Sequence, residues 1–244
     1  MMHDDASNAV LDAALAHVPF DGWTEAAFRG AIADSGVEPA LARALYPRGG
    51  VDLALAWHAR GDRHMLERLA MVRLEDLRMR DRVATAVRLR IEAICDRELL
   101  RRSMTLFALP PHAADGARAI WGTADQIWTA LGDTSRDANW YSKRAILSGV
   151  YSATVLYWLG DESPGQMATR DFLDRRIDEV MQFEKVKATA NANPVFRAAF
   201  ALPLWALGQI RAPQPRTDLP GKWEPGPPRD PVPEDARESS GSNR

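Results

Sequence analysis

The sequence contains one cysteine, Cys95, so an intramolecular disulfide and a zinc site built from cysteines are both excluded. We expect this cysteine to be a small buried hydrophobic residue, and a reducing compartment suits it. No useful length of the chain alternates apolar and polar residues as strands do, which leaves an all-α fold. A secretory signal is also lacking at the N-terminus, so a cytoplasmic location is expected.

An excess of charge of one sign is lacking as well. The 244 residues carry 31 lysines and arginines against 33 aspartates and glutamates, a net charge of −2. Generic nucleic-acid binding requires positive charge to neutralise phosphates, and this chain does not supply it. With 46% hydrophobic residues, the composition is that of a globular protein with room for one domain and a tail.

Patterns that carry catalysis or metal binding are missing. No Glu-x-x-His pair occurs, which excludes a di-iron hydroxylase built on a helical bundle. His58 and His64 are six residues apart and point away from each other on a helix, so we interpret the histidines as solvated or core residues. The turn at 160–165 departs from a nucleophile elbow because two residues separate its Gly from its Ser. We expect no catalytic residue, no metal and no cofactor.

Helical patterns are present along most of the chain. A first helix is expected at 6–17 and is ended by Pro19 and Gly22, a second starts at Thr24, and a third opens at Glu38-Pro39. Three short helices with a glycine-containing turn resemble a helix-turn-helix of TetR type, which we assign to residues 6–50.

The third of these helices bears on nucleic-acid binding. It offers an acid and apolar residues where phosphate and base contacts need arginine, lysine, asparagine or glutamine, and Arg43 is its one cation. We therefore expect no nucleic-acid binding, and a TetR-like repressor remains the alternative function.

The body of the chain is expected at residues 51–187. The pattern is helical over 51–109, with Gly61 as an interruption and with arginines that alternate with acids as on solvated helices. Apolar residues over 120–131 fall on one helical face. Ser163-Pro164-Gly165-Gln166 supplies a cap, a first-turn proline and a glutamine that closes a capping box for a further helix.

A helix with an unusual start lies at the centre of this body. Asn139-Trp140-Tyr141-Ser142-Lys143-Arg144 is polar, aromatic and cationic, whereas residues 145–159 are apolar or small at every angular position. Such a helix is surrounded by protein or by an apolar ligand. Trp140 and Tyr141 combine apolar faces with polar edges, as residues at contact surfaces do.

The C-terminal quarter differs in character. After a small and polar link at 187–192, residues 194–210 predict an apolar helix too short to span a membrane. We expect it to lie on a membrane surface or to pack on protein. The residues assigned to membrane contact are Phe196, Phe200, Trp205, Leu207 and Ile210. The proline-rich tail at 211–244 is expected to be disordered.

Three segments of the body carry a family resemblance: Asn139-Trp140-Tyr141, Arg144-Ala145-Ile146-Leu147 and Phe172-Leu173-Asp174-Arg175-Arg176-Ile177. They resemble the signature of the ubiquinone-biosynthesis accessory proteins, the ninth member of the Coq series, over about residues 97–187. The resemblance implies an all-helical fold related to TetR regulators and an internal cavity for an isoprenoid lipid. It also implies a non-catalytic protein that presents a quinone precursor to the demethoxyubiquinone hydroxylase, peripheral on the inner face of the membrane.

The resemblance gives the apolar helices a function. We expect an apolar cavity between the helices at 84–109, 115–131 and 137–159, with the polar head of the lipid near its mouth. The residues assigned to lipid contact are Leu106, Trp121, Ile127, Trp128, Leu147, Val150, Tyr151 and Val155. Trp140, Tyr141 and Arg144 are assigned to the docking surface for the hydroxylase. A scaffold with a filled core, and homodimerisation, are left open.

Overall fold

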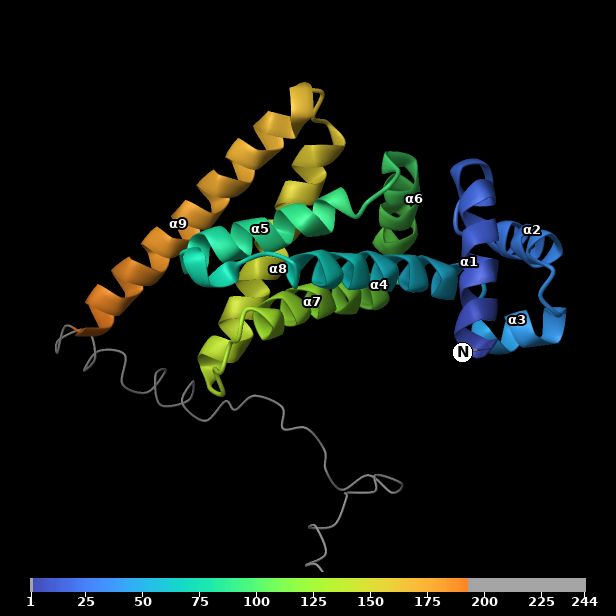
Figure 1. Ribbon diagram of the computed structural model, residues 1–244, viewed down its shortest axis with the longest axis horizontal. Helices are drawn as coiled ribbons and strands as arrows, with labels where there is room; N and C mark the ends of the chain where they lie inside the picture. Colours follow the sequence, from blue (N-terminus) through green and yellow to red (C-terminus); the bar gives the residue numbers. More distant parts are fainter. Residues whose placement is uncertain (1, 193–244) are drawn as a thin grey trace, which may run out of the picture. The chain divides into compact units, whose positions relative to one another are not determined.

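The computed structural model describes the backbone of residues 2–192 and the side chains of residues 4–180. Within these ranges the secondary structure is helical and contains no strand, which confirms the all-α prediction (Figure 1). Two short 3₁₀-helices, η1 (Leu74–Asp76) and η2 (Pro164–Gln166), interrupt the α-helices. The α-helices are α1 (Met2–Asp21), α2 (Glu25–Ser35), α3 (Pro39–Leu45), α4 (Gly50–Leu69), α5 (Met79–Glu92), α6 (Arg97–Ala108), α7 (Ala113–Ala130), α8 (Ala138–Leu159) and α9 (Met167–Ala192).

Local signals account for the boundaries of the first three helices. The hydroxyl of Thr24 accepts a hydrogen bond from the backbone N–H of Ala27 at 3.3 Å and so caps α2. Glu38 caps α3 by accepting from Leu41 N–H at 2.8 Å. Of the two residues expected to end α1, Pro19 does not end it, because a proline in the last turn removes only one helical hydrogen bond. The helix continues to Asp21 and stops before Gly22, which has φ 68°.

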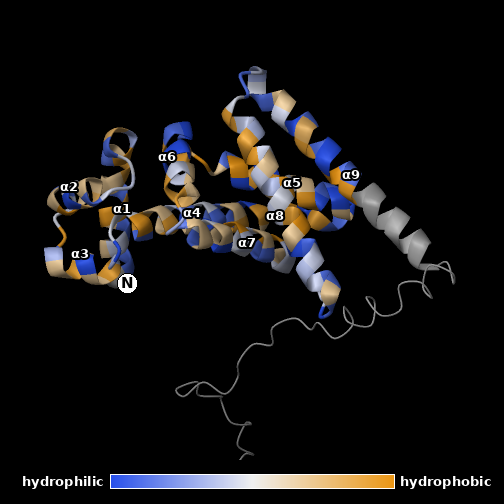
Figure 2. Cartoon of the chain, turned by 180° about the vertical axis from the view of Figure 1, so that it is seen from behind, coloured by the Kyte–Doolittle hydropathy of each residue, from blue (hydrophilic) through white to orange (hydrophobic). Residues whose placement is uncertain are grey.

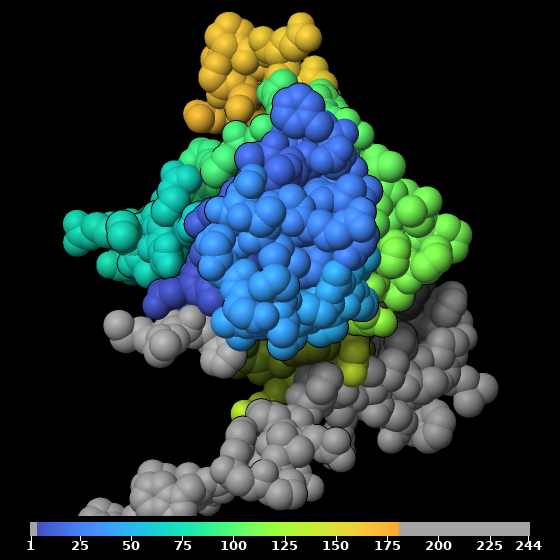
Figure 3. Space-filling view, turned by 90° about the vertical axis from the view of Figure 1, so that its right-hand side faces the viewer, coloured from blue at the N-terminus to red at the C-terminus, as the bar shows by residue number. Residues whose placement is uncertain are grey.

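These helices share an apolar core of their own. The space-filling view shows the N-terminal residues gathered closely at one end (Figure 3). The hydroxyl of Tyr46 donates to the backbone carbonyl of Ser7 at 2.9 Å and so ties α3 to α1. The core also reaches α4 and α6, and its buried members include Val10, Leu11, Ala14, Val18, Trp23, Ala27, Phe28, Ala31, Ala42, Leu53, Ala54 and Leu99.

The run expected at 51–109 is three helices, α4, α5 and α6. Gly61 does not interrupt α4. A Cβ atom at this position would lie 2.7 Å from Nη1 of Arg90, so the glycine leaves room for an arginine of the facing helix. The breaks come instead at η1 and before Asp96, whose carboxylate accepts from Glu98 N–H at 2.6 Å and caps α6.

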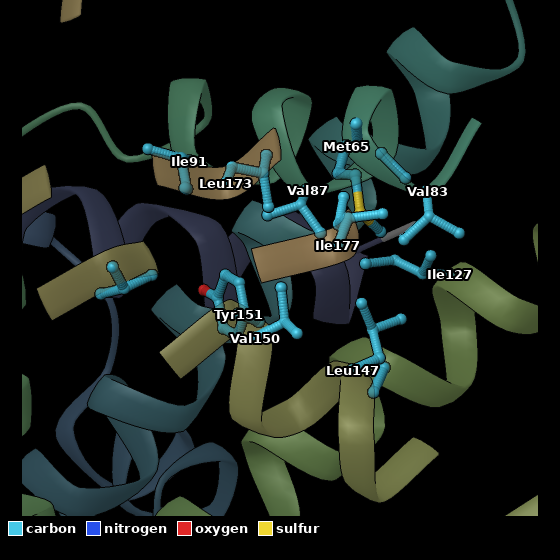
Figure 4. Close-up of a cluster of buried hydrophobic side chains, with 14 of the residues drawn as sticks. Met65, Val83, Val87, Ile91, Ile127, Leu147, Val150, Tyr151, Leu173 and Ile177 are labelled. Atoms are coloured by element: carbon cyan, nitrogen blue, oxygen red, sulfur yellow. The ribbon is translucent and has the colours of Figure 1, made fainter. Parts of the chain in front are cut away.

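The second core lies among α4, α5, α7, α8 and α9. Figure 4 shows Val83 and Val87 of α5, Leu147 of α8 and Ile177 of α9 directed toward one another. The hydropathy view shows apolar residues along α4, α5 and α8 and stretches of hydrophilic residues along α9 (Figure 2). α7 packs on one side of α8 and α9 on another. Ala145, Gly149, Leu156 and Tyr157 stay exposed, so protein covers this apolar helix only in part.

The start of α9 differs from the predicted capping box. Gln166 has φ 58° and ends η2, so it does not occupy the first turn of α9. The carboxylate of Asp161 accepts instead from Ser163 N–H at 2.8 Å and from Thr169 N–H at 2.9 Å. These bonds hold the pKa of Asp161 well below its usual range.

Residues 187–192, which were predicted to be a link, are part of α9. Every second residue of this segment is alanine, the best helix former. Within the described part of the chain, no helix is long and apolar enough to cross a membrane. The predicted apolar helix at 194–210 and the tail at 211–244 lie outside the described residues.

Candidate ligand-binding site

An apolar cavity of about 380 Å³ lies between α4, α6, α7 and α8 and is called cavity 1 here. This volume is within the range of small-molecule binding sites. The residues that line it are Trp57, His58, Leu100, Ser103, Met104, Phe107, Ala108, Ala113, Gly116, Ala117, Ala119, Ile120, Tyr151, Ser152, Val155 and Leu156. The helices α6, α7 and α8 were expected around a cavity, and α4 is a fourth wall that the sequence reading missed.

Cavity 1 has a buried end and an exposed end. Tyr151 is 4% exposed, whereas Leu156, five residues further along α8, is 58% exposed. Ala108, Ala113 and Ala117 of α6 and α7 are exposed as well. The mouth is therefore built from apolar and small side chains, while polar groups lie toward the interior.

A buried polar network lies behind the inner end. Nε of Arg90 donates to Oδ1 of Asp62 at 2.5 Å, and both side chains are about 3–4% exposed. Thr123 donates to the same Asp62 oxygen at 2.9 Å. Arg90 also donates through Nη2 to the backbone carbonyl of His58 at 3.1 Å. The charges of Arg90 and Asp62 compensate each other, as a buried ion pair requires.

His58 joins this network in its neutral form. Burial, together with the charge of Arg90, lowers its pKa to about 4. Nη2 of Arg90 lies 3.3 Å from Nδ1, which therefore accepts, so Nε2 carries the proton and donates to the Thr123 hydroxyl at 2.8 Å. The prediction that arginines of 51–109 lie on solvated faces was wrong for Arg90.

A second cavity, cavity 2, has a volume of about 480 Å³ and lies between α5, the end of α7, α8 and α9. Its apolar lining residues are Met79, Val83, Trp128, Ile146, Leu147, Val150, Ile177 and Val180. Two cations lie at this cavity, and both are paired. Arg80 lies 2.8 Å from Asp178, and Nζ of Lys143 lies 2.7 Å from Asp133.

Asp133 fastens the loop before α8 to that helix. Its side chain is 3% exposed and accepts from Lys143, from the hydroxyl of Ser135 at 2.8 Å and from Arg144 at 3.1 Å. Burial alone would raise the pKa of Asp133, but these hydrogen bonds lower it to about 2.

The aromatic start of α8 packs against α7. The ring centroids of Trp140 and Tyr141 lie 4.8 Å apart, and those of Trp140 and Trp121 lie 6.0 Å apart. Trp140 and Tyr141 are both half-buried. The guanidinium of Arg144 lies 4.0 Å from the Trp140 ring, donates to Asp125 at 2.5 Å and is 3% exposed. Arg144 therefore supports this surface from inside and does not present its charge to solvent.

The residues assigned to lipid contact do not form one group. Tyr151 and Val155 line cavity 1. Trp128, Leu147 and Val150 line cavity 2. Three others line neither cavity: Ile127 is fully buried in the second core, Leu106 packs on the N-terminal core, and Trp121 lies against Trp140.

Two other features departed from the sequence reading. Trp57 and His58 on α4 line cavity 1. The available signal was the spacing of His58 to Asp62, because residues four apart share one helical face. Cys95 is exposed, so its assignment as a buried residue was wrong. It lies in the short connection between α5 and α6.

Comparison with known proteins identifies relatives for this chain. Residues 113–184 match the COQ9 family model. The chain is 32% identical over 213 residues to the ubiquinone biosynthesis protein COQ9, mitochondrial, of Drosophila melanogaster, with coverage of 81% of this chain and 64% of that protein. The corresponding human protein is 29% identical over 204 residues, with coverage of 78% and 63%. The chain thus spans a little under two thirds of the length of these relatives.

The fold has a relative among solved structures. The TetR transcriptional regulator from Nitrosomonas europaea ATCC 19718 superposes with a TM-score of 0.58 at 19% identity, over 71% of this chain and 96% of the regulator. At this identity the likeness shows the fold alone. The predicted TetR-like fold is confirmed.

Proposed function

This chain carries the COQ9 family domain and is related to the COQ9 proteins over most of its length, and from this premise we propose that it is a non-catalytic lipid-binding accessory protein of ubiquinone biosynthesis. The names of the relatives support a role in that biosynthesis. The ligand of this chain is an isoprenoid lipid or quinone precursor, and its partner is the demethoxyubiquinone hydroxylase.

Cavity 1 is the observation that carries the proposal. It is lined mostly by apolar side chains of four helices and reaches from exposed Leu156 to buried Tyr151. A polyprenyl chain that enters it removes apolar area from water, at roughly 25 cal/mol per Å². This free energy drives the extraction of a lipid from a membrane.

A substitution that fills cavity 1 tests the lipid-binding function. Ser152 lines the cavity from α8 and is half-buried, so Ser152→Trp places a large ring in the space of the ligand. We expect the lipid that co-purifies with the full chain to fall about tenfold, the effect of losing about 1.4 kcal/mol of binding free energy. Organic extraction followed by mass spectrometry measures the lipid per mole of protein.

The matched control is Gly149→Trp on the same helix. Gly149 is exposed, lines neither cavity and has no atom within 4 Å of its would-be Cβ, so this variant adds the same ring outside the site. Equal lipid content in wild type and Ser152→Trp, with both folded, would contradict ligand binding in cavity 1.

The aromatic start of α8 is the proposed docking surface for the hydroxylase. Trp140 and Tyr141 are half-buried and supported by Arg144 and Trp121 beneath them. Aromatic residues with one packed face and one accessible edge are typical anchors of interfaces.

Replacing both anchors is expected to weaken association with the hydroxylase by about 2 kcal/mol or more. The variant is Trp140→Ala with Tyr141→Ala, and its affinity is measured by titration of the purified partner. The control is Tyr157→Ala with Phe172→Ala, a stacked and partly exposed pair that joins the other end of α8 to α9. Circular dichroism checks that both variants fold, and equal losses in both would remove the assignment of the docking surface to Trp140 and Tyr141.

The alternative function, DNA binding by a TetR-like repressor, has no support from α3. The Glu38 carboxylate is used as the helix cap, and Arg43 pairs with Glu25 and lies 4.5 Å from the ring of Phe28. The cation of this helix is thus exposed but paired within the chain, and the exposed acid repels phosphate. Peripheral attachment to the inner face of a membrane through 194–210 stays a prediction.

A further inference from the structure

The hydroxyl of Tyr151 belongs to the lining of cavity 1, and the described residues supply no hydrogen-bond partner for it. It is not one of the fully buried side-chain atoms without a partner, so it opens onto the cavity. The residue is 4% exposed and lines the inner end of cavity 1. Figure 4 shows the hydroxyl oxygen directed away from the neighbouring apolar side chains of Val150 and Leu147. A hydroxyl that opens onto a cavity and has no partner in the chain is available to a group that enters the cavity.

The other polar groups at the inner end are already satisfied. Both ring nitrogens of His58 are used, one toward Arg90 and one toward Thr123. Ser103 donates to the backbone carbonyl of Leu99 at 2.9 Å. Among the buried polar residues of the lining, Tyr151 is therefore the side chain with hydrogen-bonding capacity left for a ligand. Burial raises the pKa of Tyr151, so the hydroxyl keeps its proton and donates.

The charges behind Tyr151 sum to zero. The guanidinium of Arg90 lies 5.7 Å from the Tyr151 ring, but its charge is compensated by Asp62 at 2.5 Å, and neutral His58 adds none. An anionic group brought into this end would find no spare cation and would lose its water. An uncharged oxygen, such as a carbonyl, loses little hydration free energy and accepts a hydrogen bond from the tyrosine hydroxyl.

We propose that cavity 1 binds an uncharged, oxygen-bearing ring head inward, with a head oxygen accepting from Tyr151 and the apolar tail leaving past Leu156. This inference rests on the proposed lipid-binding function and specifies its ligand. The orientation is opposite to the one expected from the sequence, in which the head stays near the mouth. It follows from an apolar mouth and a polar inner end. Acidic ring precursors and prenyl diphosphates are excluded from this site, and neutral quinones or phenols are accepted.

Three probes of similar shape test the chemical class. They are a 1,4-benzoquinone with a ten-carbon chain, decylbenzene and 4-decylbenzoate, titrated into delipidated full chain. We expect the quinone to bind most tightly and the carboxylate most weakly. Tyr151→Phe should weaken the binding of the quinone about three- to tenfold, because one hydrogen bond is lost. The affinity for decylbenzene should stay unchanged. Tyr157→Phe, on the same helix but outside the cavity, is the control and should change neither.

Each outcome bears on a different statement. If wild type binds all probes but Tyr151→Phe leaves the quinone unchanged, the role of Tyr151 is wrong while lipid binding stands. If the affinity of the variant falls equally for the quinone and for decylbenzene, Tyr151 acts through packing and the inference also fails. If wild type binds no probe, the proposed function fails together with the inference.

The orientation has its own test. A bulky fluorophore at the free end of the quinone's chain should be tolerated, with affinity within about twofold of the parent compound, because that end lies outside. A tert-butyl group on the quinone ring should abolish binding, because the ring lies in the closed end. The reverse pattern would place the head at the mouth and overturn the inference.

Discussion

Replacing Asp62 by leucine is expected to lower the free energy of unfolding by about 3–5 kcal/mol, because the guanidinium of Arg90 is then left buried without its counter-charge. The two side chains are about 3–4% exposed, so water cannot replace the lost carboxylate. Thr123 loses one of its two acceptors as well and keeps the backbone carbonyl of Ala119 at 3.2 Å. Urea denaturation of the full chain, followed by circular dichroism, measures the loss.

Two further variants decide whether burial of the charge is the cause. Glu92→Leu removes the partner of Arg68 in an exposed pair and should cost no more than about 1 kcal/mol. The double variant Asp62→Leu with Arg90→Leu should recover most of the stability, because no unpaired charge remains. A loss in the double variant as large as in Asp62→Leu would show that shape at position 62, and not charge, matters.

The parts of the fold that the sequence predicted depend on signals within a few residues. Thr24 and Glu38 cap their helices through hydrogen bonds to residues three positions away, and these boundaries were read directly. The apolar face over 120–131 is likewise a local pattern, and it lies within α7. Such features need no knowledge of the partner element.

The parts that were missed depend on contacts distant in sequence. Gly61 looks like a helix break because glycine costs stability in a helix, yet its role is to admit Arg90 from 29 residues away. The burial of Arg90 follows from the same contact and cannot be read from α5 alone. The assignment of lipid residues failed to separate two cavities because α8 exposes Tyr151 to one and Leu147 to the other, and only packed neighbours distinguish them.

Neutral His58 also makes the stability of the chain depend on pH. Burial lowers its pKa from an ordinary value of 6.5 to about 4 in the folded chain. As the pH falls through 6.5 the unfolded chain takes up a proton that the folded chain refuses, so the free energy of unfolding falls until about pH 4. The difference corresponds to a loss of about 3 kcal/mol over this interval, of which about 2 kcal/mol is lost by pH 5.

The variant His58→Gln isolates this contribution, because glutamine keeps a donor and an acceptor but does not titrate. Urea denaturation at pH 7, 6 and 5 should show wild type losing about 2 kcal/mol more than the variant over this range. His64→Gln, at an exposed position on the same helix, should follow wild type. Parallel curves for wild type and His58→Gln would mean that the ring takes up a proton in the folded chain. The buried network would then carry a positive charge at acid pH, and the exclusion of anionic heads from cavity 1 would be lost with it.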